Sequence, residues 1–222
     1  MYFAKKYAQM QVLWVNTGKS RQVTWEGQMV TTGIFKEPAA GVHKITFTGI
    51  VGDEQADLHN HGGTDKAVYA YELSYYEHWK QVLQRPAWPG GLFGENLTTT
   101  GLPDDEVMMG DIYRTGSAIL QAVQPRIPCF KLNIRFNLPN MVDLFYEQQR
   151  HGTYFRVLQE GVVEAGDAIE LLERPQNSIS ISRVAHCFVT KGQDKALLHQ
   201  ILQITVLPQR LRQVFTRFAQ EP

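Results

Sequence analysis

Apolar and polar residues alternate in short runs through the first 175 residues, and turn-forming residues separate the runs. Alternation with a period of two is typical of strands with one buried face, and pairs such as Glu26-Gly27 and Gly116-Ser117 predict the turns of hairpins. The predicted strands and hairpins cover residues 10–18, 22–34, 43–53, 111–123 and 161–173. Many short strands of this kind favour a closed or nearly closed β-barrel, because closure removes exposed strand edges.

The pair Gly-Asp occurs three times at an expected strand edge, at residues 52–53, 110–111 and 166–167. Glycine permits the positive φ of a tight turn, and aspartate accepts hydrogen bonds from backbone N–H groups there. We therefore expect a tight turn at each of the three pairs.

Helical spacing of apolar residues interrupts the strands at residues 72–85 and 140–152, where prolines or a glycine mark the ends. After Pro175 the strand pattern ends. Three short helices are predicted there, at residues 182–190, 194–204 and 208–219. Because helices this short need packing partners, we expect a main domain of residues 1–175 and a small three-helix domain of residues 176–222.

The composition is that of an ordinary soluble protein. The chain has 22 Lys and Arg and 22 Asp and Glu, so its net charge gives no reason to expect a nucleic-acid polymer or a membrane surface as partner. No apolar run is long enough for a membrane span, and the N-terminus lacks the pattern of a signal peptide. With only two cysteines, free thiols in a reducing cytoplasm are expected.

One cysteine lies in an unusual setting, the segment "QPRIPCFKL" at residues 124–132. Arg126 precedes Cys129 and Lys131 follows it, and in an extended segment Cys129 and Lys131 would share a face. Cations beside a cysteine favour the thiolate, the form that attacks or binds a soft metal, and the flanking prolines stiffen the segment. The alternative is a small apolar residue buried at the end of a strand.

Ionisable residues are dense around Gly62-Gly63 in the segment of residues 52–71. His59 and His61 suggest a zinc or iron site, because alternate residues of a strand project together, but no third ligand follows at a firm spacing. Asp65 and Lys66 follow the glycines, and Lys66 offers a cation to an anionic ligand. A polar turn before a buried strand is the alternative interpretation.

Two further segments carry polar residues of interest. Asn96, before three threonines, offers a donor and an acceptor that suit the edge of a heterocycle, although such a residue also bonds its own loop. The acidic run of residues 103–106 is interpreted as a solvated loop.

Taken in order, residues 52–71, residues 93–102, residues 109–132 and the helical tail resemble the MOSC domain family, and within it the bacterial YiiM subgroup. The resemblance extends over residues 17–219. It implies a mainly β protein with α-helices: a MOSC-type β-barrel with inserted helices, followed by a small three-helix domain.

The resemblance also implies a pterin-based molybdenum cofactor, with the Cys129 thiolate bound to molybdenum. Arg126, Lys131 and Lys66 are then candidate contacts of the cofactor's phosphate, and Asn96 is a further candidate cofactor contact. The subgroup's motif also includes His61 and Asp65, for which substrate contact, proton delivery and scaffolding are open roles. Of these we expect a catalytic role, with His61 as proton donor and Asp65 as the residue that orients it.

The activity implied by the resemblance is reduction of N-hydroxylated compounds, such as 6-N-hydroxylaminopurine, to the amine, a detoxification. Electrons would come from a separate flavin-type reductase, since the chain has no haem, iron–sulfur or flavin motif. The helical tail is a candidate docking surface for that donor or for a second copy, so a homodimer is left open.

Two other functions stay open at this point. One is a non-catalytic carrier of the cofactor or a sulfur-handling module, because MOSC domains also occur in cofactor sulfurases. The other is a metal-dependent hydrolase built on His59 and His61.

Overall fold

The computed structural model describes residues 10–57, 62–84 and 89–221. Its strands are β1 (Gln11–Thr17), β2 (Arg21–Trp25), β3 (Gln28–Thr32), β4 (Glu37–Ala39), β5 (His43–Thr46), β6 (Gly49–Ile50), β7 (Val68–Glu72), β8 (Leu97–Thr100), β9 (Ile112–Thr115), β10 (Ala118–Pro125), β11 (Thr153–Gln159), β12 (Gly161–Val163) and β13 (Ile169–Glu173). Its helices are η1 (Thr64–Lys66), α2 (Leu73–Leu83), α3 (Lys131–Phe136), α4 (Met141–Gln148), α5 (Ile181–Val189), α6 (Lys195–Leu202) and α7 (Gln209–Gln220).

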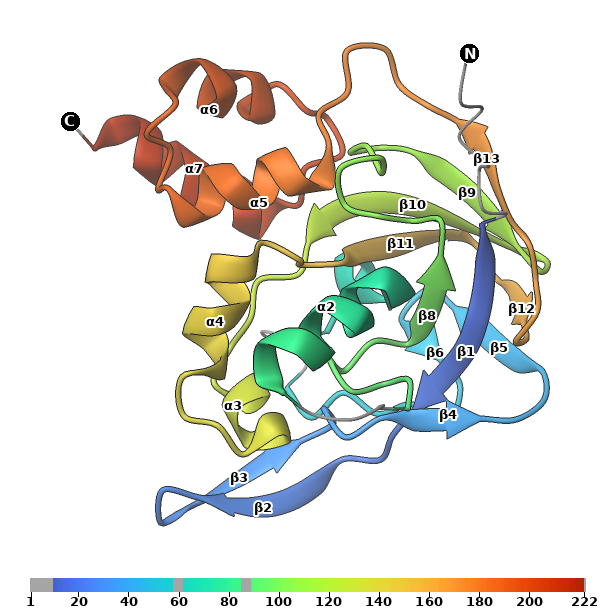
Figure 1. Ribbon diagram of the computed structural model, residues 1–222. Helices are drawn as coiled ribbons and strands as arrows, with labels where there is room; N and C mark the ends of the chain where they lie inside the picture. Colours follow the sequence, from blue (N-terminus) through green and yellow to red (C-terminus); the bar gives the residue numbers. More distant parts are fainter. Residues whose placement is uncertain (1–9, 58–61, 85–88, 222) are drawn as a thin grey trace, which may run out of the picture.

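Eight strands form one curved sheet in the order β13-β9-β10-β11-β7-β8-β1-β4, and only β7 and β8 run parallel (Figure 1). The sheet curls until Gln11 at the start of β1 meets Ala168, just before β13, in a single β-bridge. The main-chain N–H groups of Val12 and Ile169 donate to Asp167 and Met10 across this seam, at 2.9 and 2.8 Å. The predicted mainly β fold with helices is confirmed, but a continuous ladder does not close the barrel.

Two smaller sheets complete the β structure, the three-stranded β12-β5-β6 and the β2–β3 hairpin. The hairpin extends from the body at the bottom of Figure 1. All three predicted Gly-Asp turns are present, with a φ of 90° at Gly110 and 99° at Gly52 and Gly166. Two of these turns precede a strand, β9 or β13, and the turn at Gly52 follows β6.

The helices predicted by spacing are present, with small shifts at their ends. The predicted helix at 140–152 ends at Gln148, because Gln149 takes a left-handed φ of 50° and the chain then enters β11. Asp194 caps α6 as expected, accepting a hydrogen bond from the N–H of Leu197 at 2.9 Å. Helix α3 was not predicted.

The core has two parts. One fills the curved sheet and continues without a break into the apolar faces of α5, α6 and α7, through residues such as Val184, Leu198 and Phe215. The other is an aromatic cluster between β7 and α2, α3 and α4, with Tyr71, Trp79 and Phe93 at its centre.

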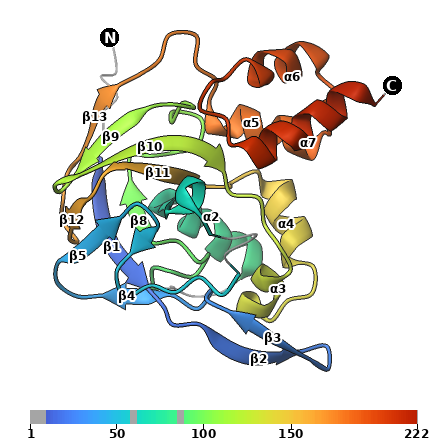
Figure 2. The same ribbon diagram turned by 180° about the vertical axis from the view of Figure 1, so that it is seen from behind.

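The three C-terminal helices gather at one end of the sheet, as the view from behind shows (Figure 2). Their helical structure agrees with the expectation, while the division of the chain at residue 175 stays a prediction. Within the described residues, no helix combines the length and the apolar composition that crossing a bilayer requires.

Candidate functional site

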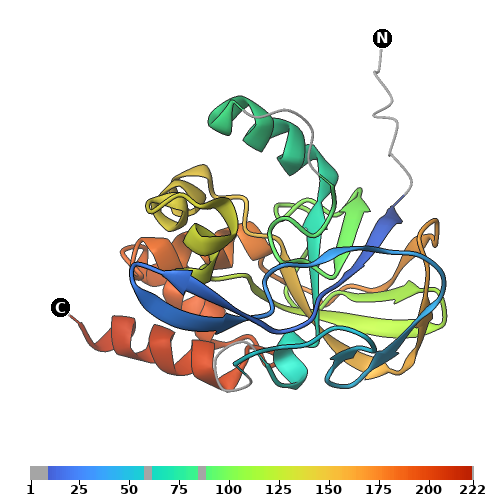
Figure 3. The same ribbon diagram turned by 90° about the horizontal axis from the view of Figure 1, so that it is seen from below.

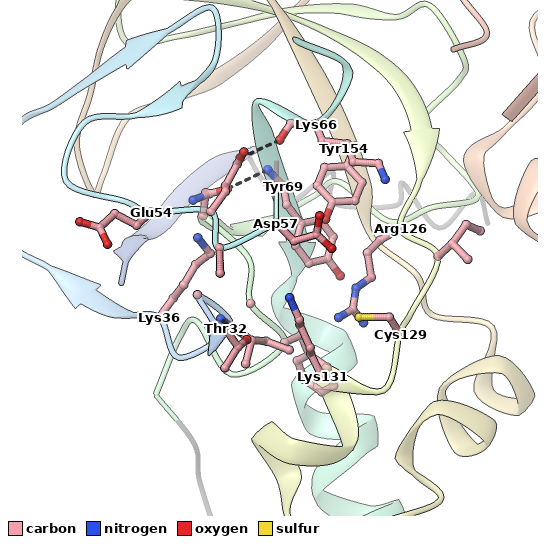
Figure 4. Close-up of a pocket in the computed structure, with 18 residues that line it drawn as sticks. Thr32, Lys36, Glu54, Asp57, Lys66, Tyr69, Arg126, Cys129, Lys131 and Tyr154 are labelled. Carbon is pink, nitrogen blue, oxygen red and sulfur yellow. Dashed lines mark hydrogen bonds between the residues drawn. The ribbon is translucent and has the colours of Figure 1, made fainter. Parts of the chain in front are cut away.

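An open cleft lies beside the curved sheet, with about 650 Å³ of empty space that includes some of the solvent at its mouth. Its walls come from residues 32–36 after β3, residues 54–57 before η1, residues 93–96 before β8, and residues 126–131 between β10 and α3, with Lys66, Tyr69 and Tyr154 completing the lining (Figure 4). The cleft therefore gathers segments that lie far apart in the sequence.

Five of the seven predicted site residues line this cleft: Lys66, Asn96, Arg126, Cys129 and Lys131. Asp65 does not line it, and His61 lies outside the described residues, as does His59. The segments singled out in the sequence thus converge on one place, whereas the proton-donor assignment for His61 and Asp65 stays a prediction.

Cys129 lies where the chain turns from β10 into α3. The expected extended segment is wrong at this point, because Phe130 is in the helical region with φ −54° and Lys131 begins α3. The N–H of Leu132 donates to the carbonyl oxygen of Cys129 at 2.9 Å, which fixes this first turn. The sulfur of Cys129 and the ammonium of Lys131 nevertheless point into the same space (Figure 4).

Cys129 is half-buried, and Cys187 is buried in the apolar face of α5. Neither cysteine forms a disulfide in the described structure. Burial raises the pKa of the Cys187 thiol to about 11, so this cysteine is a packing residue.

The guanidinium of Arg126 is a buried charge in the cleft wall. Arg126 is 6% exposed, its Nη1 atom has no hydrogen-bond partner, and among the described residues no carboxylate pairs with it. It lies over the rings of Phe145 and Tyr69, at 5.0 and 5.7 Å from their centroids. A buried cation that faces a cleft without a counterion is suited to bind an anionic ligand.

Lys36 also lines the cleft, and sequence reasoning missed it. It is buried and pairs with Asp53, whose other contacts are the N–H of Gly18 at 3.0 Å and the side-chain amide of Asn96 at 2.9 Å. Burial lowers the pKa of Lys36, and Asp53 opposes that shift. Through Asp53, the segment after β3 that carries Lys36 is thus linked to the segment before β8 that carries Asn96.

Asn96 is buried in the wall, and its side chain is largely used there. Its Oδ1 accepts the N–H of Tyr69 at 3.1 Å, while its Nδ2 donates to Asp53. The side chain of Asn96 therefore helps to hold the cleft wall together, and its contact with a ligand stays a prediction.

Asp65 pairs with Arg156 of β11, whose Nε and Nη2 atoms donate to its Oδ1 at 2.8 and 2.5 Å. Among the described residues, no three His, Cys, Asp or Glu side chains are grouped as a metal site. The hydrolase hypothesis depends on His59 and His61 and gains no support from the described part of the chain.

The acidic run before β9 is not wholly solvated, so that expectation is wrong for Asp104. Asp104 is buried and accepts the N–H groups of His151 at 2.7 Å and Gly152 at 3.0 Å. The ring of His151 in turn contacts the carbonyl oxygen of Arg126 through Nδ1 at 3.0 Å, and burial lowers the pKa of His151 to about 4. Asp104 thereby supports the backbone on which Arg126 lies.

Replacing Asp104 by asparagine is expected to change how stability depends on pH. Burial raises the pKa of Asp104 to about 7, from the ordinary value of 3.8, so between these values the folded state binds a proton that the unfolded state has released. The stability of the wild type relative to Asp104→Asn should therefore fall as pH rises from 4 to 8, by on the order of 4 kcal/mol. Urea unfolding of both proteins at several pH values measures this difference, and a constant difference would show that Asp104 is ionised throughout.

Residues 57–170 match the family model described as the MOSC domain, and this range contains Lys66, Asn96, Arg126 and Cys129. The chain belongs to the MOSC domain family. The matched range holds most of the cleft, whereas the β2–β3 hairpin precedes it and α5, α6 and α7 follow it.

Similar proteins support the same assignment. Uncharacterized protein YflK from Bacillus subtilis is 37% identical over 96% of both chains. The crystal structure of YiiM from Geobacillus stearothermophilus is 35% identical, has a TM-score of 0.80 and is matched over 99% of its length by 95% of this chain. The predicted MOSC and YiiM-like character is thus confirmed over nearly the whole chain.

A third relative is larger. A protein from Gibberella moniliformis named "Reductase" is 36% identical to 87% of this chain, which matches 35% of the fungal protein. In that relative, a region similar to this MOSC protein is one part of a longer chain.

Proposed function

We propose that this MOSC protein is a molybdenum-cofactor-dependent reductase that converts N-hydroxylated compounds, such as 6-N-hydroxylaminopurine, to amines. The observation that carries the proposal is that a cysteine thiol and a buried guanidinium, to which no described residue offers a carboxylate, lie in the wall of one cleft. Thiolate sulfur suits a soft metal, and a guanidinium suits a phosphate. The name of the fungal relative, "Reductase", supports the type of reaction.

The residues of the cleft fit a pterin-based molybdenum cofactor. Cys129 would hold the metal, and the orphaned Nη1 of Arg126 would meet the cofactor's phosphate together with Lys131 and Lys66. When bound, the cofactor supplies a redox-active metal for two-electron reduction, and the protein supplies binding, orientation and electrostatics.

The walls of the cleft also suit a flat heterocyclic substrate. The rings of Tyr69, Phe93 and Tyr154 line it, and aromatic faces of this kind pack against a purine or pyrimidine. Burial raises the pKa of Tyr154 to about 12, so its hydroxyl keeps its proton at neutral pH. Packing against these rings orients the substrate and excludes water from the reacting N–O bond.

The reaction consumes two electrons and two protons, breaks the N–O bond, and yields the amine and water. We propose that the electrons come from a separate flavin-type reductase and that the protein acts in the cytoplasm. His61 is the proposed proton donor, because the solution pKa of histidine lies near neutrality, with Asp65 as its supporting group.

The test starts with protein purified from a host that makes the cofactor. We expect a stoichiometric amount of molybdenum and formation of adenine from 6-N-hydroxylaminopurine when reduced methyl viologen supplies the electrons. Protein from a host unable to make the cofactor is the matched control, and it should be inactive.

Three results would contradict the proposal in different ways. Molybdenum without turnover of any N-hydroxylated compound would favour the carrier or sulfur-handling alternative. Zinc or iron in place of molybdenum would favour a site at His59 and His61. Turnover by the control protein would show that the reaction does not need the cofactor.

A further inference from the structure

The turn between α4 and β11 carries a buried histidine that the proposed reaction does not use. His151 is 0% exposed, and its ring lies edge-on to Phe145, with 5.5 Å between the ring centroids. Helix α4, which ends just before this turn, lies beside α3 in yellow in Figure 3, with α2 above them in green. A polar ring that is fully enclosed needs a hydrogen-bond partner, so the partner of His151 indicates what the residue does.

That partner is the main chain of Arg126 in the cleft wall. The Nδ1 atom of His151 lies 3.0 Å from the carbonyl oxygen of Arg126. Because a carbonyl oxygen only accepts hydrogen bonds, Nδ1 carries the proton and the ring is in the Nδ1–H tautomer. The N–H group of Arg126 donates to the carbonyl oxygen of Gly152 at 3.2 Å. Residues 151 and 152 thus hold both main-chain polar groups of Arg126.

The turn that holds Arg126 is itself fixed. All four main-chain polar groups of His151 and Gly152 are hydrogen-bonded, because Asp104 accepts both N–H groups and the hydroxyl of Tyr69 donates to the carbonyl oxygen of His151 at 2.7 Å. Gly152 has a φ of 70°, and an added Cβ would lie 2.6 Å from a carbonyl oxygen of β7. The turn is therefore a support that cannot shift easily.

The ring of His151 is an uncharged support. Burial lowers the pKa of His151 to about 4, the bond to the Arg126 carbonyl opposes this shift, and the charge of Arg126 adds to it. The Nε2 atom has no partner among the described residues, so a proton there would be a buried donor without an acceptor. A neutral donor fixes the main chain of Arg126 without placing a like charge, or a neutralising carboxylate, beside the guanidinium.

We propose that His151 is a positioning residue of the anion site, whose Nδ1–H group holds the carbonyl oxygen of Arg126 and thereby aims the Arg126 guanidinium into the cleft. This inference rests on the proposed function, in which Arg126 meets a phosphate. Among the described residues, the guanidinium contacts the rings of Phe145 and Tyr69 rather than a carboxylate. Such ring contacts lack the fixed fork geometry of a carboxylate pair, so the direction of the side chain depends on its main chain.

The same bond acts on the segment that carries the cysteine. Cys129 follows Arg126 by three residues, and Pro128 restricts the chain between them. The N–H group of Leu132 fixes the far end of the segment through the carbonyl oxygen of Cys129, at 2.9 Å. Loss of the His151 bond should therefore loosen the near end and lower molybdenum retention as well as phosphate binding.

Two substitutions of equal shape isolate this hydrogen bond. Asparagine places its amide nitrogen as many bonds from Cα as Nδ1 of histidine, and leucine has the shape of asparagine without a donor. His151→Asn therefore keeps a donor for the Arg126 carbonyl, whereas His151→Leu removes it. The matched control is His78→Leu, which removes the contact of a histidine Nε2 with Oε1 of Gln148 at 2.6 Å, away from the lining of the cleft.

The first measurement is binding of inorganic phosphate to the cofactor-free protein, followed by the line width of the phosphorus NMR signal. We expect His151→Leu to bind phosphate about ten times more weakly than the wild type, as on removal of an outer partner that orients a binding group. His151→Asn should restore most of the affinity, and His78→Leu should bind like the wild type. Arg126→Gln should weaken binding at least as much as His151→Leu.

The second measurement reads the tautomer of His151. Nitrogen NMR of protein labelled at its histidine rings should show one ring with Nδ1 protonated and Nε2 bare between about pH 6 and pH 8, and this signal should be absent from His151→Asn. The Nδ1–H form is the minor neutral form of free histidine, so its presence requires an acceptor such as the Arg126 carbonyl. A proton on Nε2 of His151 would overturn the inference.

Urea unfolding of the same variants separates positioning from a general loss of stability. If His151→Asn binds phosphate as weakly as His151→Leu, or if phosphate affinity follows the free energy of unfolding across all variants, His151 is a packing residue and the inference is wrong. A wild-type protein that binds no phosphate would also overturn it.

The failures of the two proposals are distinguishable, because phosphate binding and the tautomer are measured without the cofactor. If the wild-type holoenzyme shows no viologen-driven turnover, the proposed function is wrong, and the expected order of phosphate affinities would still support His151 as a positioning residue of an anion site. If the holoenzyme turns over but the order of phosphate affinities fails, the role of His151 is wrong and the proposed function stands.

Discussion

Replacing Cys129 by serine is expected to remove molybdenum from the protein and to lower N-hydroxyl reduction by at least about a thousandfold. A serine hydroxyl keeps its proton at neutral pH and offers a hard oxygen, whereas a soft metal prefers thiolate sulfur. Metal analysis of the purified variant, beside viologen-driven turnover of 6-N-hydroxylaminopurine, measures both effects. Because Cys129 is half-buried in the cleft wall, the substitution should leave the fold intact.

The matched control is Cys187→Ala. Cys187 lies in the buried face of α5, away from the lining of the cleft, so this variant should keep its molybdenum and lose only some packing free energy. Full molybdenum content in Cys129→Ser would show that the metal is held elsewhere. Loss of metal in both variants would point to general instability instead.

The cysteine segment shows what sequence can and cannot predict about this site. The cations and prolines around Cys129 are its neighbours in the sequence. Their expected effects, favouring the thiolate and stiffening the segment, could therefore be predicted from residues 124–132 alone. Helix α3 was not accessible, because it has only six residues and a helix this short carries little signal of its own. Its stability comes from packing, since Leu132 and Phe136 are buried against the aromatic cluster.

Lys36 and His151 were missed for a different reason. Lys36 pairs with Asp53, 17 positions away, and His151 is bonded to Asp104, 47 positions away. Neither residue has a local motif, and their roles depend on burial that only the folded chain creates. A buried polar residue is informative because it needs a partner, but the sequence does not reveal which polar residues are buried.

Strands, turns and the helical tail were predictable because their signals are local. The Gly-Asp turns need only a glycine that takes positive φ, and the tail helices show helical spacing and a capping aspartate. The incomplete closure of the sheet was not predictable, since the seam between Gln11 and Ala168 joins the two ends of the β region. A contact of such long range follows from the whole arrangement of strands.

Glu95 is the residue on which the largest change in stability is expected. It is fully buried directly before Asn96, and it accepts hydrogen bonds from the N–H groups of Gly91 at 2.8 Å and Phe93 at 3.0 Å. The hydroxyl groups of Tyr76 and Thr98 also donate to it. Burial raises the pKa of Glu95, and these donors oppose that shift.

Replacing Glu95 by alanine leaves four buried donors without an acceptor and opens space beneath the loop that forms one wall of the cleft. We expect the free energy of unfolding to fall by about 4 kcal/mol, the scale observed when one member of a buried polar network is removed. Because the loop also places Asn96, molybdenum retention should fall as well. Urea unfolding of the cofactor-free protein measures the first effect, and metal analysis measures the second.

Two variants make this test specific to the buried network. Glu95→Gln keeps the shape of the side chain and one acceptor oxygen. Its free energy of unfolding should therefore fall by roughly half as much as that of Glu95→Ala. Glu173→Ala, at an exposed position at the end of β13, should stay within about 0.5 kcal/mol of the wild type. If the free energy of unfolding of Glu95→Ala falls by less than about 1 kcal/mol, water replaces the carboxylate. The shape of the cleft wall would then depend on the Lys36–Asp53 pair and Asn96 rather than on Glu95.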